Sequence, residues 1–390
     1  MAIYPLLFLA VCCQTCNKGS RLLIALFAIA LGASTFWIGV LIALYGFFPA
    51  FLAIYAGRLS DRFGPRLPMV LGAFGVGLGL WLPWALGSLP ALFASAALIG
   101  AAFVFFQVSL QNLMGSLGER TERASNYSQL SLAAAVSSFL APVLTGFWID
   151  RYGYTTTYGI LGTLAVVTGV GLLVLPFVPG RGSRKQRSGK GQGLGGLLQD
   201  ADLRRTLVVS GVVVTGVHLY SFYFPIYGHE IGFSASRIGV VMGSYAVAAF
   251  IVRMVMPAVV RVYSEGRVLT HSLWVSGLAF FLFPFFRDLY TLTALSFLLG
   301  LGLGCGQPLS ILMTFNSSPE GRSGEVLGVR LTANKGIQVA VPVLFGSMGA
   351  AFGLFPVFWA NAGLLLLGGG ISVRRRTRDP GETPEGEGAP

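Results

Sequence analysis

Long apolar runs separated by short polar breaks make up nearly the whole chain. Each run has about 20 residues, the length that an α-helix needs to cross a bilayer core of about 30 Å. Most runs exceed strand length and lack the alternation of a lipid-facing barrel strand, so they predict helices. The twelve predicted helices lie near residues 4–30, 35–56, 67–87, 90–114, 126–148, 156–179, 205–228, 235–257, 268–286, 290–314, 326–349 and 354–373.

Residues within these runs recur with an offset of 200. Matching pairs include Gly32 and Gly232, Gly39 and Gly239, Tyr45 and Tyr245, Gln107 and Gln307, and Pro142 and Pro342. One offset held over so much chain indicates a tandem duplication. Two copies of one apolar unit are typical of transporters whose halves rock around a site at their interface.

One long polar break, rich in Gly, Ser, Lys and Arg, follows the sixth run. We therefore predict an N-terminal six-helix bundle at 1–179, a flexible cytoplasmic linker at 180–204 and a C-terminal six-helix bundle at 205–373. The tail at 374–390 is dominated by Pro, Gly and Glu, and we expect it to be disordered.

Composition and charge place the chain in a membrane. Hydrophobic residues make up 54% of the chain and charged residues 11%, which leaves too little polar surface for a soluble globule. The formal net charge is +12, but the basic residues gather in alternate loops, which argues against a nucleic-acid partner. This asymmetry predicts that both termini lie in the cytoplasm. The first run lacks a basic start and a cleavage site, so we expect it to stay as the first helix.

A conspicuous motif, GRLSDRFGPR, joins the second and third runs at residues 57–66. It resembles the signature loop of the major facilitator superfamily, with Pro65 at a position where that family usually has a basic residue. Helix count, central linker and repeat extend the resemblance over nearly the whole chain. The resemblance implies an all-α membrane protein with twelve transmembrane helices in two pseudo-symmetric bundles. Gly57 would allow close helix packing, Gly64 would supply a turn, and Arg66 is the basic residue that ends the motif.

The same resemblance assigns a gating role to the loop. It implies that Asp61 lies near the positive N-terminus of helix 11, and that Arg62 reaches an acidic group after helix 4, either Glu119 or Glu122. Such contacts would latch the cytoplasmic side shut. The alternative is that the loop only anchors the chain by its positive charge. Arg261 stands 200 residues after Asp61, so the latch is expected in one half only.

Ionisable residues in mid-helix are the sharpest sign of a binding site, because each costs about 2.5 to 3.5 kcal/mol at the bilayer centre. Lys18 and Arg21 share one face of the first run with Gln14 and Asn17. Arg21 is about 15 Å from the outer end of this helix, beyond the reach of its side chain. We therefore predict a water-filled cavity in which these four residues contact the substrate.

Other polar side chains inside the runs are further candidates for substrate contact. They are Gln107 and Gln111 in the fourth run, His218 in the seventh, Gln307 in the tenth, and Arg330, Asn334 and Gln338, spaced four apart, in the eleventh. The amides suit a polar ligand and equally suit bonds between helices. Arg330 could anchor its helix at the interface instead. His218 could carry a coupling proton or be buried and neutral.

Acidic residues are confined to loops and run ends. The predicted cavity is therefore cationic or neutral, which favours an anionic or zwitterionic solute and removes the usual carboxylate proton carrier. Coupling through His218, a proton on the ligand, solute exchange and facilitated passage all remain open.

These observations predict a secondary active transporter for a small organic solute, anionic or amphiphilic, working by alternating access. The resemblance favours export. The alternatives are an uptake permease for an anionic metabolite and a non-transporting receptor or scaffold on a transporter fold. No phosphate loop or catalytic constellation indicates an enzyme, and we expect no cofactor. Cys13 and Cys16 form a lone C-x-x-C, which we interpret as buried thiols rather than a metal site. We expect a monomer whose partners are the substrate and membrane lipids, with a coupling proton as one option.

Overall fold

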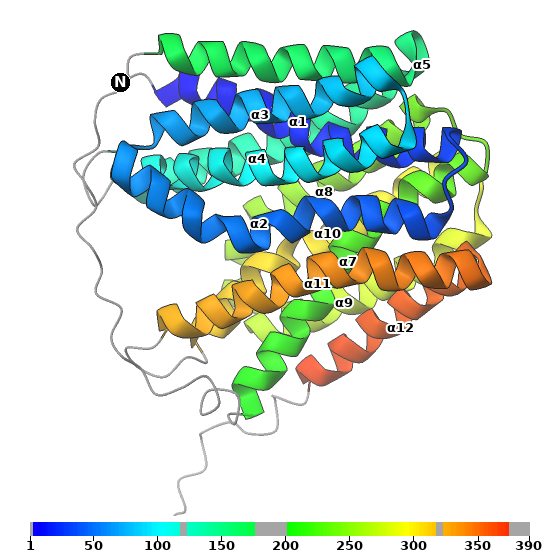
Figure 1. Ribbon diagram of the computed structural model, residues 1–390. Helices are drawn as coiled ribbons and strands as arrows, with labels where there is room; N and C mark the ends of the chain where they lie inside the picture. The colour runs from blue at the N-terminus through cyan, green and yellow to red at the C-terminus, as the bar shows by residue number, and fades with distance from the viewer. Residues whose placement is uncertain (1–2, 118–122, 176–200, 317–322, 374–390) are drawn as a thin grey trace, which may run out of the picture.

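The computed structural model describes residues 3–117, 123–175, 201–316 and 323–373, all of them helical or in short turns (Figure 1). The helices are α1 (Ile3–Ala30), α2 (Thr35–Phe63), α3 (Arg66–Leu86), α4 (Leu89–Ser116), α5 (Arg123–Val174), α7 (Ala201–Glu230), α8 (Ala235–Val262), α9 (Glu265–Leu282), α10 (Leu289–Asn316), α11 (Ser323–Phe352) and α12 (Leu354–Val373). A short 3-10 helix, η1 (Phe283–Phe285), follows α9.

The long helix α5 consists of two arms that run in opposite directions. The chain reverses at Gly153, whose φ of 77° is a left-handed conformation that favours glycine. Thr145 and Leu161, eight residues before and after Gly153, both pack against Gly19 of α1, as antiparallel arms require. With the two arms counted separately, the described residues contain twelve long helices, and the predicted fold class is confirmed.

Ten of the described helices are long and apolar enough to cross a membrane, and one of these ten, Ser128–Val174, contains both arms of α5. Their outer surfaces are apolar, as lipid contact demands: Leu78, Val167 and Leu367 are among many large hydrophobic side chains that stand exposed. The predicted linker, latch acids and tail fall mostly in residues 118–122, 176–200 and 374–390, outside the described part of the chain. Helix α7 begins at Ala201 rather than at residue 205.

The two copies of the repeat pack alike. Gly100 of α4 lies against the backbone of Tyr45 in α2, and Gly300 of α10 lies against the backbone of Tyr245 in α8. A side chain at either glycine would push these helices apart, because a Cβ on Gly300 would lie 2.3 Å from the Tyr245 carbonyl oxygen. The offset of 200 therefore corresponds to equivalent places in three dimensions.

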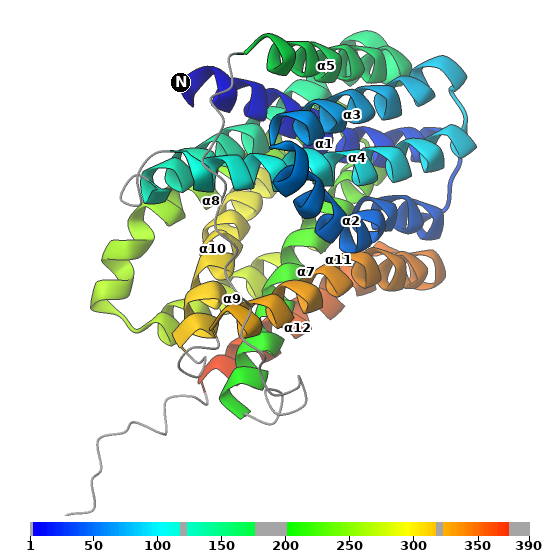
Figure 2. The ribbon, with the colours of Figure 1, turned by 60° about the vertical axis from the view of Figure 1, so that its left-hand side comes forward.

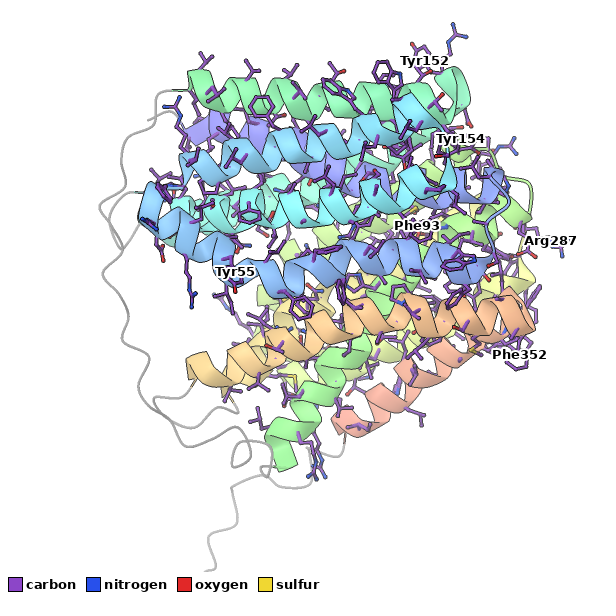
Figure 3. The ribbon with its side chains drawn as sticks, in the orientation of Figure 1. Tyr55, Phe93, Tyr152, Tyr154, Arg287 and Phe352 are labelled. Atoms are coloured by element: carbon purple, nitrogen blue, oxygen red, sulfur yellow. The ribbon has the colours of Figure 1, made fainter. Side chains whose placement is uncertain are left out.

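The halves meet where α2 crosses α11 and where α5 crosses α8. At the first crossing, a Cβ on Gly39 would lie 2.3 Å from the carbonyl oxygen of Pro342, and at the second, a Cβ on Gly239 would lie 2.3 Å from that of Pro142. Both crossings lie toward the end of the bundle that carries Asp150, which we call the Asp150 end. Tyr152, Arg287 and Phe352 mark this end in Figure 3.

At the opposite end, which carries the loop of residues 57–66 and which we call the basic-loop end, the helices of the two halves diverge (Figure 2). Near the beginning of α11, Leu331, Thr332, Ala333 and Lys335 are all exposed, whereas Arg330 and Asn334 on the remaining face bond to α10 and α7. The molecule is therefore closed at the Asp150 end and open at the basic-loop end.

Candidate functional site

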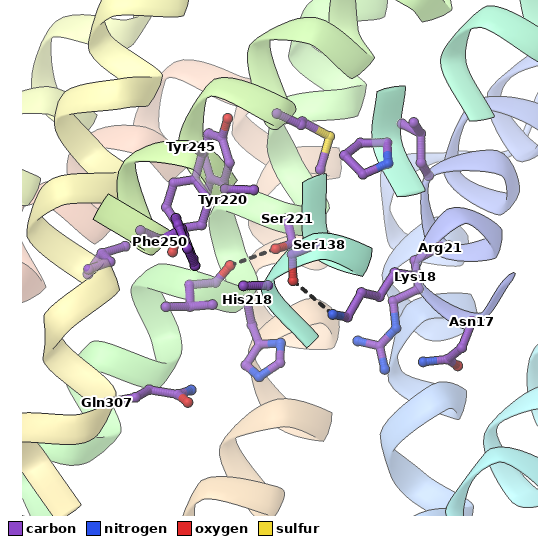
Figure 4. Close-up of a pocket in the computed structure, with 18 of the residues that line it drawn as sticks. Asn17, Lys18, Arg21, Ser138, His218, Tyr220, Ser221, Tyr245, Phe250 and Gln307 are labelled. Atoms are coloured by element: carbon purple, nitrogen blue, oxygen red, sulfur yellow. Dashed lines mark hydrogen bonds between the residues drawn. The ribbon is translucent and has the colours of Figure 1, made fainter. Parts of the chain in front are cut away.

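A cavity of about 320 Å³ lies between the two halves. Helices α1, α5, α7, α8 and α10 supply its walls, so both copies of the repeat contribute. Figure 4 shows Lys18 and Arg21 of α1 on one side of it, Tyr245 and Gln307 on the other, and His218 between them. The cavity lies at the level of the polar stretch of α1, and Asn17, Lys18 and Arg21 of that stretch line it.

Lys18 is held by α5 through three hydrogen bonds. Its Nζ donates to the carbonyl oxygen of Ala134 at 2.7 Å and to the hydroxyls of Ser137 and Ser138 at 2.9 and 2.8 Å. Both serine hydroxyls donate their own hydrogens to Ala134, so they can only accept from the lysine. A lysine ammonium has three N–H donors, so this arrangement of three acceptors suits the charged form of Lys18.

Arg21 presents a guanidinium with spare donors. The group lies over the ring of Tyr45, with 5.2 Å between its central carbon and the ring centroid. The Tyr45 hydroxyl donates to Ser20, which fixes the ring beneath the guanidinium. The Nε of Arg21 is buried and has no hydrogen-bond partner among the described residues. An unpaired buried donor on a cation is unfavourable, so an anion in the cavity would stabilise this arrangement.

Arg253 of α8 supplies a second guanidinium from the other half. It lines the cavity, and its Nε donates to the carbonyl oxygen of Gly304 at 2.9 Å. Arg253 is exposed, and this is the one hydrogen bond of its side chain within the described part of the chain, so its two terminal nitrogens have donors left. The sequence pattern did not predict this residue as part of the site. Arg253 lies four residues before the predicted end of its run at residue 257, where an arginine ordinarily reaches toward the membrane surface.

The side chains at the cavity that can carry a positive charge come from several helices, and no carboxylate lies among them. The charges of Arg21 and Arg253 both act on Lys18, and those of Arg21 and Lys335 both act on His218. Lys335 itself is exposed and donates to the Gln338 side chain at 3.1 Å. None of the residues that line the cavity is Asp or Glu, so its potential is positive.

The polar residues predicted on α1, α4 and α10 divide between the cavity and the helix contacts. Asn17 and Gln307 line the cavity. Gln14 is buried away from it, and its amide nitrogen has no partner among the described residues. Gln107 and Gln111 of α4 do not line it, and Gln111 is exposed.

The polar stripe of α11 holds that helix against its neighbours. Arg330 is buried and donates to the hydroxyl of Ser310 in α10 at 2.7 Å. Asn334 exchanges bonds with the hydroxyl of Ser210 in α7 at 3.2 to 3.3 Å. Gln338 packs beside Gly46 of α2. The three residues share one face, as their spacing predicted, but that face does not line the cavity.

The motif of residues 57–66 makes contacts within its own half. Asp61 accepts a bond from the amide of Asn112 in α4 at 3.1 Å, and the same amide donates to Ser60 at 3.0 Å. Asp61 therefore contacts α4 of its own half. The guanidinium of Arg62 lies over the ring of Phe63, and its predicted partners after α4 lie outside the described residues.

The rest of the motif fixes the start of α3. Gly64 has a φ of 79°, which suits a glycine at the turn, and Gly57 faces Val108 of α4. Arg66 donates to the carbonyl oxygens of Leu172 and Leu173 at the end of α5. These bonds tie the motif to the second arm of α5.

At the Asp150 end a carboxylate links the two halves. The oxygens of Asp150 on α5 accept bonds from the backbone N–H groups of Ala235 at 3.0 Å and Ser236 at 2.8 Å. These N–H groups belong to the first turn of α8, whose positive end favours a negative charge. Nearby, the hydroxyl of Thr35 on α2 donates to the carbonyl oxygen of Gly346 on α11 at 3.3 Å.

The thiols and the remaining titratable groups form no metal centre in the described part of the chain. Cys13 and Cys16 are both buried, and the Cys16 thiol donates to the carbonyl oxygen of Leu161 at 3.3 Å.

Comparisons of sequence and of fold show which known proteins this chain is similar to. A sequence model described as Major Facilitator Superfamily matches residues 6–269 and again residues 206–390. The chain is 22% identical over 356 residues to "Multidrug resistance protein MdtG" of Dickeya zeae (strain Ech586), covering 88% of this chain and 86% of that one.

Solved structures share the fold at lower identity. The crystal structure of the nucleoside transporter NupG superposes with a TM-score of 0.79 at 14% identity, covering 97% of this chain and 100% of that one. The crystal structure of the peptide transporter POT in complex with sulfate superposes with a TM-score of 0.76 at 15% identity, covering 95% of this chain and 93% of that one.

Proposed function

The chain belongs to the major facilitator superfamily and is an integral membrane transporter rather than an enzyme, and we propose that its substrate is a small organic anion. One observation carries the substrate class: Lys18, Arg21 and Arg253 line the central cavity, and its lining includes no Asp or Glu. Arg21 lines this cavity, and its buried Nε has no partner among the described residues, so it keeps a donor for an anion.

Alternating access would proceed by rocking of the halves about the crossings of α2 with α11 and α5 with α8. The asymmetry of basic loops favours a cytoplasmic basic-loop end, which makes the described state inward-open. In the opposite state Asp61 would leave Asn112 and cap the N-terminus of α11, closing the cytoplasmic side.

Export is the favoured direction, because the chain resembles relatives named as multidrug resistance proteins over most of its length. Loading from the cytoplasm suits an open basic-loop end. The cavity of about 320 Å³ is at the small end for drug-sized ligands, which favours a compact anion over a bulky amphiphile.

Flux measurements in proteoliposomes test the substrate class. We expect a panel of radiolabelled organic anions to contain transported compounds, and cationic dyes of similar size to be excluded. Arg21→Ala should lower anion flux by at least tenfold. Arg237→Ala removes an exposed arginine from the first turn of α8, outside the cavity, and is the matched control. Anion flux that is unchanged in Arg21→Ala, or transport of the cations alone, would refute the proposal.

A further inference from the structure

The charges of the cavity are shared between the two moving halves. Lys18 and Arg21 belong to α1 of the first half, whereas Arg253 belongs to α8 and Lys335 to α11 of the second. Arg21 and Arg253 both act on Lys18, and Arg21 acts on Lys335, so the two groups already repel one another in the open state. Closing the basic-loop end brings the halves together on the side of the cavity where this repulsion acts.

The residues that the structure describes supply no negative charge to offset this repulsion at the cavity. The side chains that line it include no carboxylate. Lys18 is bonded to neutral oxygens, which satisfy its donors but leave its charge in place. Burying uncompensated like charges together is strongly unfavourable in a low-dielectric interior. Without a bound anion, the repulsion between the basic groups therefore opposes closure of the basic-loop end.

Arg21 and Arg253 both line the cavity and both have donors left for a ligand. The Nε of Arg21 has no partner within the described ranges, and Arg253 uses its Nε on Gly304, which leaves its two terminal nitrogens for another acceptor. Each guanidinium can bind one carboxylate or phosphate group through two parallel hydrogen bonds. Tyr220 and Tyr245, stacked with their ring centroids 4.7 Å apart, give the cavity a flat wall for the organic part of a ligand.

From this distribution we propose that the substrate is a doubly charged organic anion that bridges Arg21 and Arg253, and that the carrier closes only when such an anion is bound. Transport is then an obligate exchange: each passage of one dianion requires the return of another, because the empty carrier cannot recross. This inference rests on the proposed anion transport and specifies its substrate and its coupling.

Counterflow in proteoliposomes tests the exchange. The purified full-length chain is reconstituted into vesicles that contain either 10-fold excess unlabelled dianion or buffer alone, and uptake of radiolabelled succinate and glycerol 3-phosphate is followed, with lactate as the singly charged probe. We expect at least tenfold faster uptake of a dianion into the dianion-loaded vesicles, and little uptake of lactate under either condition.

The outcomes separate this inference from the proposed function. Equal uptake of dianions into loaded and buffer-filled vesicles would overturn obligate exchange while leaving anion transport standing. Transport of lactate as fast as that of the dianions would overturn the bridging of two arginines. Absence of transport for every anion, in vesicles where cationic dyes are transported, would overturn the proposed function and this inference together.

Substitutions at Arg253 supply a second readout. Arg253→Gln removes one of the bridging charges, so dianion exchange should fall at least tenfold while net uptake of lactate into buffer-filled vesicles rises. Arg253→Lys keeps the charge and should remain limited to exchange. Arg261→Gln makes the same change on an exposed arginine two turns further along α8 and should behave as the wild type. Wild-type behaviour of Arg253→Gln would overturn the proposal.

Discussion

Replacing Asp150 by Asn should open the Asp150 end of the molecule. The carboxylate of Asp150 on α5 accepts the backbone N–H groups of Ala235 and Ser236, so it bonds directly from one half to the other. These bonds can form only while α5 and α8 are together at this end. An asparagine has nearly the same shape, but its single oxygen accepts one bond well and carries no charge.

The size of the effect follows from these two bonds. Hydrogen bonds to a charged group contribute about 1.5 to 3 kcal/mol each, and Asp150 is exposed, so the low end of this range applies to both. The asparagine oxygen retains one neutral bond of about 1 kcal/mol. The closed Asp150 end therefore loses about 2 kcal/mol, which corresponds to a shift of about 30-fold in the ratio of the two states.

Distances between spin labels measure that ratio. Leu31 and Phe352 lie on opposite halves at the Asp150 end and are 38% and 73% exposed, so labels there leave the packing intact. In a background without native cysteines, Asp150→Asn should raise the ratio of the long to the short distance by about 30-fold. Asp288→Asn is the control, because Asp288 bonds to the backbone of Thr291 in its own half, and this bond lowers the pKa of Asp288. An unchanged distance distribution in Asp150→Asn, or an equal change in the control, would refute the reasoning.

Three other substitutions test neighbouring parts of the structure. Gly239→Ala places a Cβ against the Pro142 carbonyl oxygen, and the same labels should report a shift toward opening at the Asp150 end. Arg330→Met removes the bond to Ser310 between α11 and α10, and thermal unfolding in detergent should show a loss of about 1 to 3 kcal/mol; an unchanged midpoint would count against the bond. Asp61→Asn should favour the state open at the basic-loop end. Cysteines introduced at that end should then react faster with a thiol reagent than they do without the Asp61→Asn change.

The helices and their pairing could be predicted because both depend on patterns within the chain. Apolar length gives the spans, and the offset of 200 gives equivalent positions such as Gly100 and Gly300. The face of α1 that carries Lys18 and Arg21 could be predicted as well, because two charges in mid-helix require a polar environment wherever the helix lies.

What a polar face contacts could not be predicted from helical spacing. Arg330, Asn334 and Gln338 lie on one face. Only the packing of the helices shows that Ser310 accepts a hydrogen bond from Arg330 and that Ser210 accepts one from Asn334. Arg253 could not be predicted as a cavity residue for a related reason. Its distance from the end of its run suggests the membrane surface, and the bond to Gly304 that turns it inward depends on how α8 and α10 cross.

The glycine crossings have a consequence for the origin of the molecule. Gly39 contacts Pro342 and Gly239 contacts Pro142, so position 39 of one copy meets position 142 of the other in both directions. Such reciprocity is the mark of an isologous interface, the kind that joins two identical subunits around a twofold axis. A single six-helix ancestor could have paired with itself through these contacts before the genes fused. Asp150, which contacts α8, and the arginines Arg21 and Arg253 have no equivalent residue 200 positions away, so they require two different halves. The contacts that close the Asp150 end and the residues of the cavity could therefore diverge only once the dimer had become one chain.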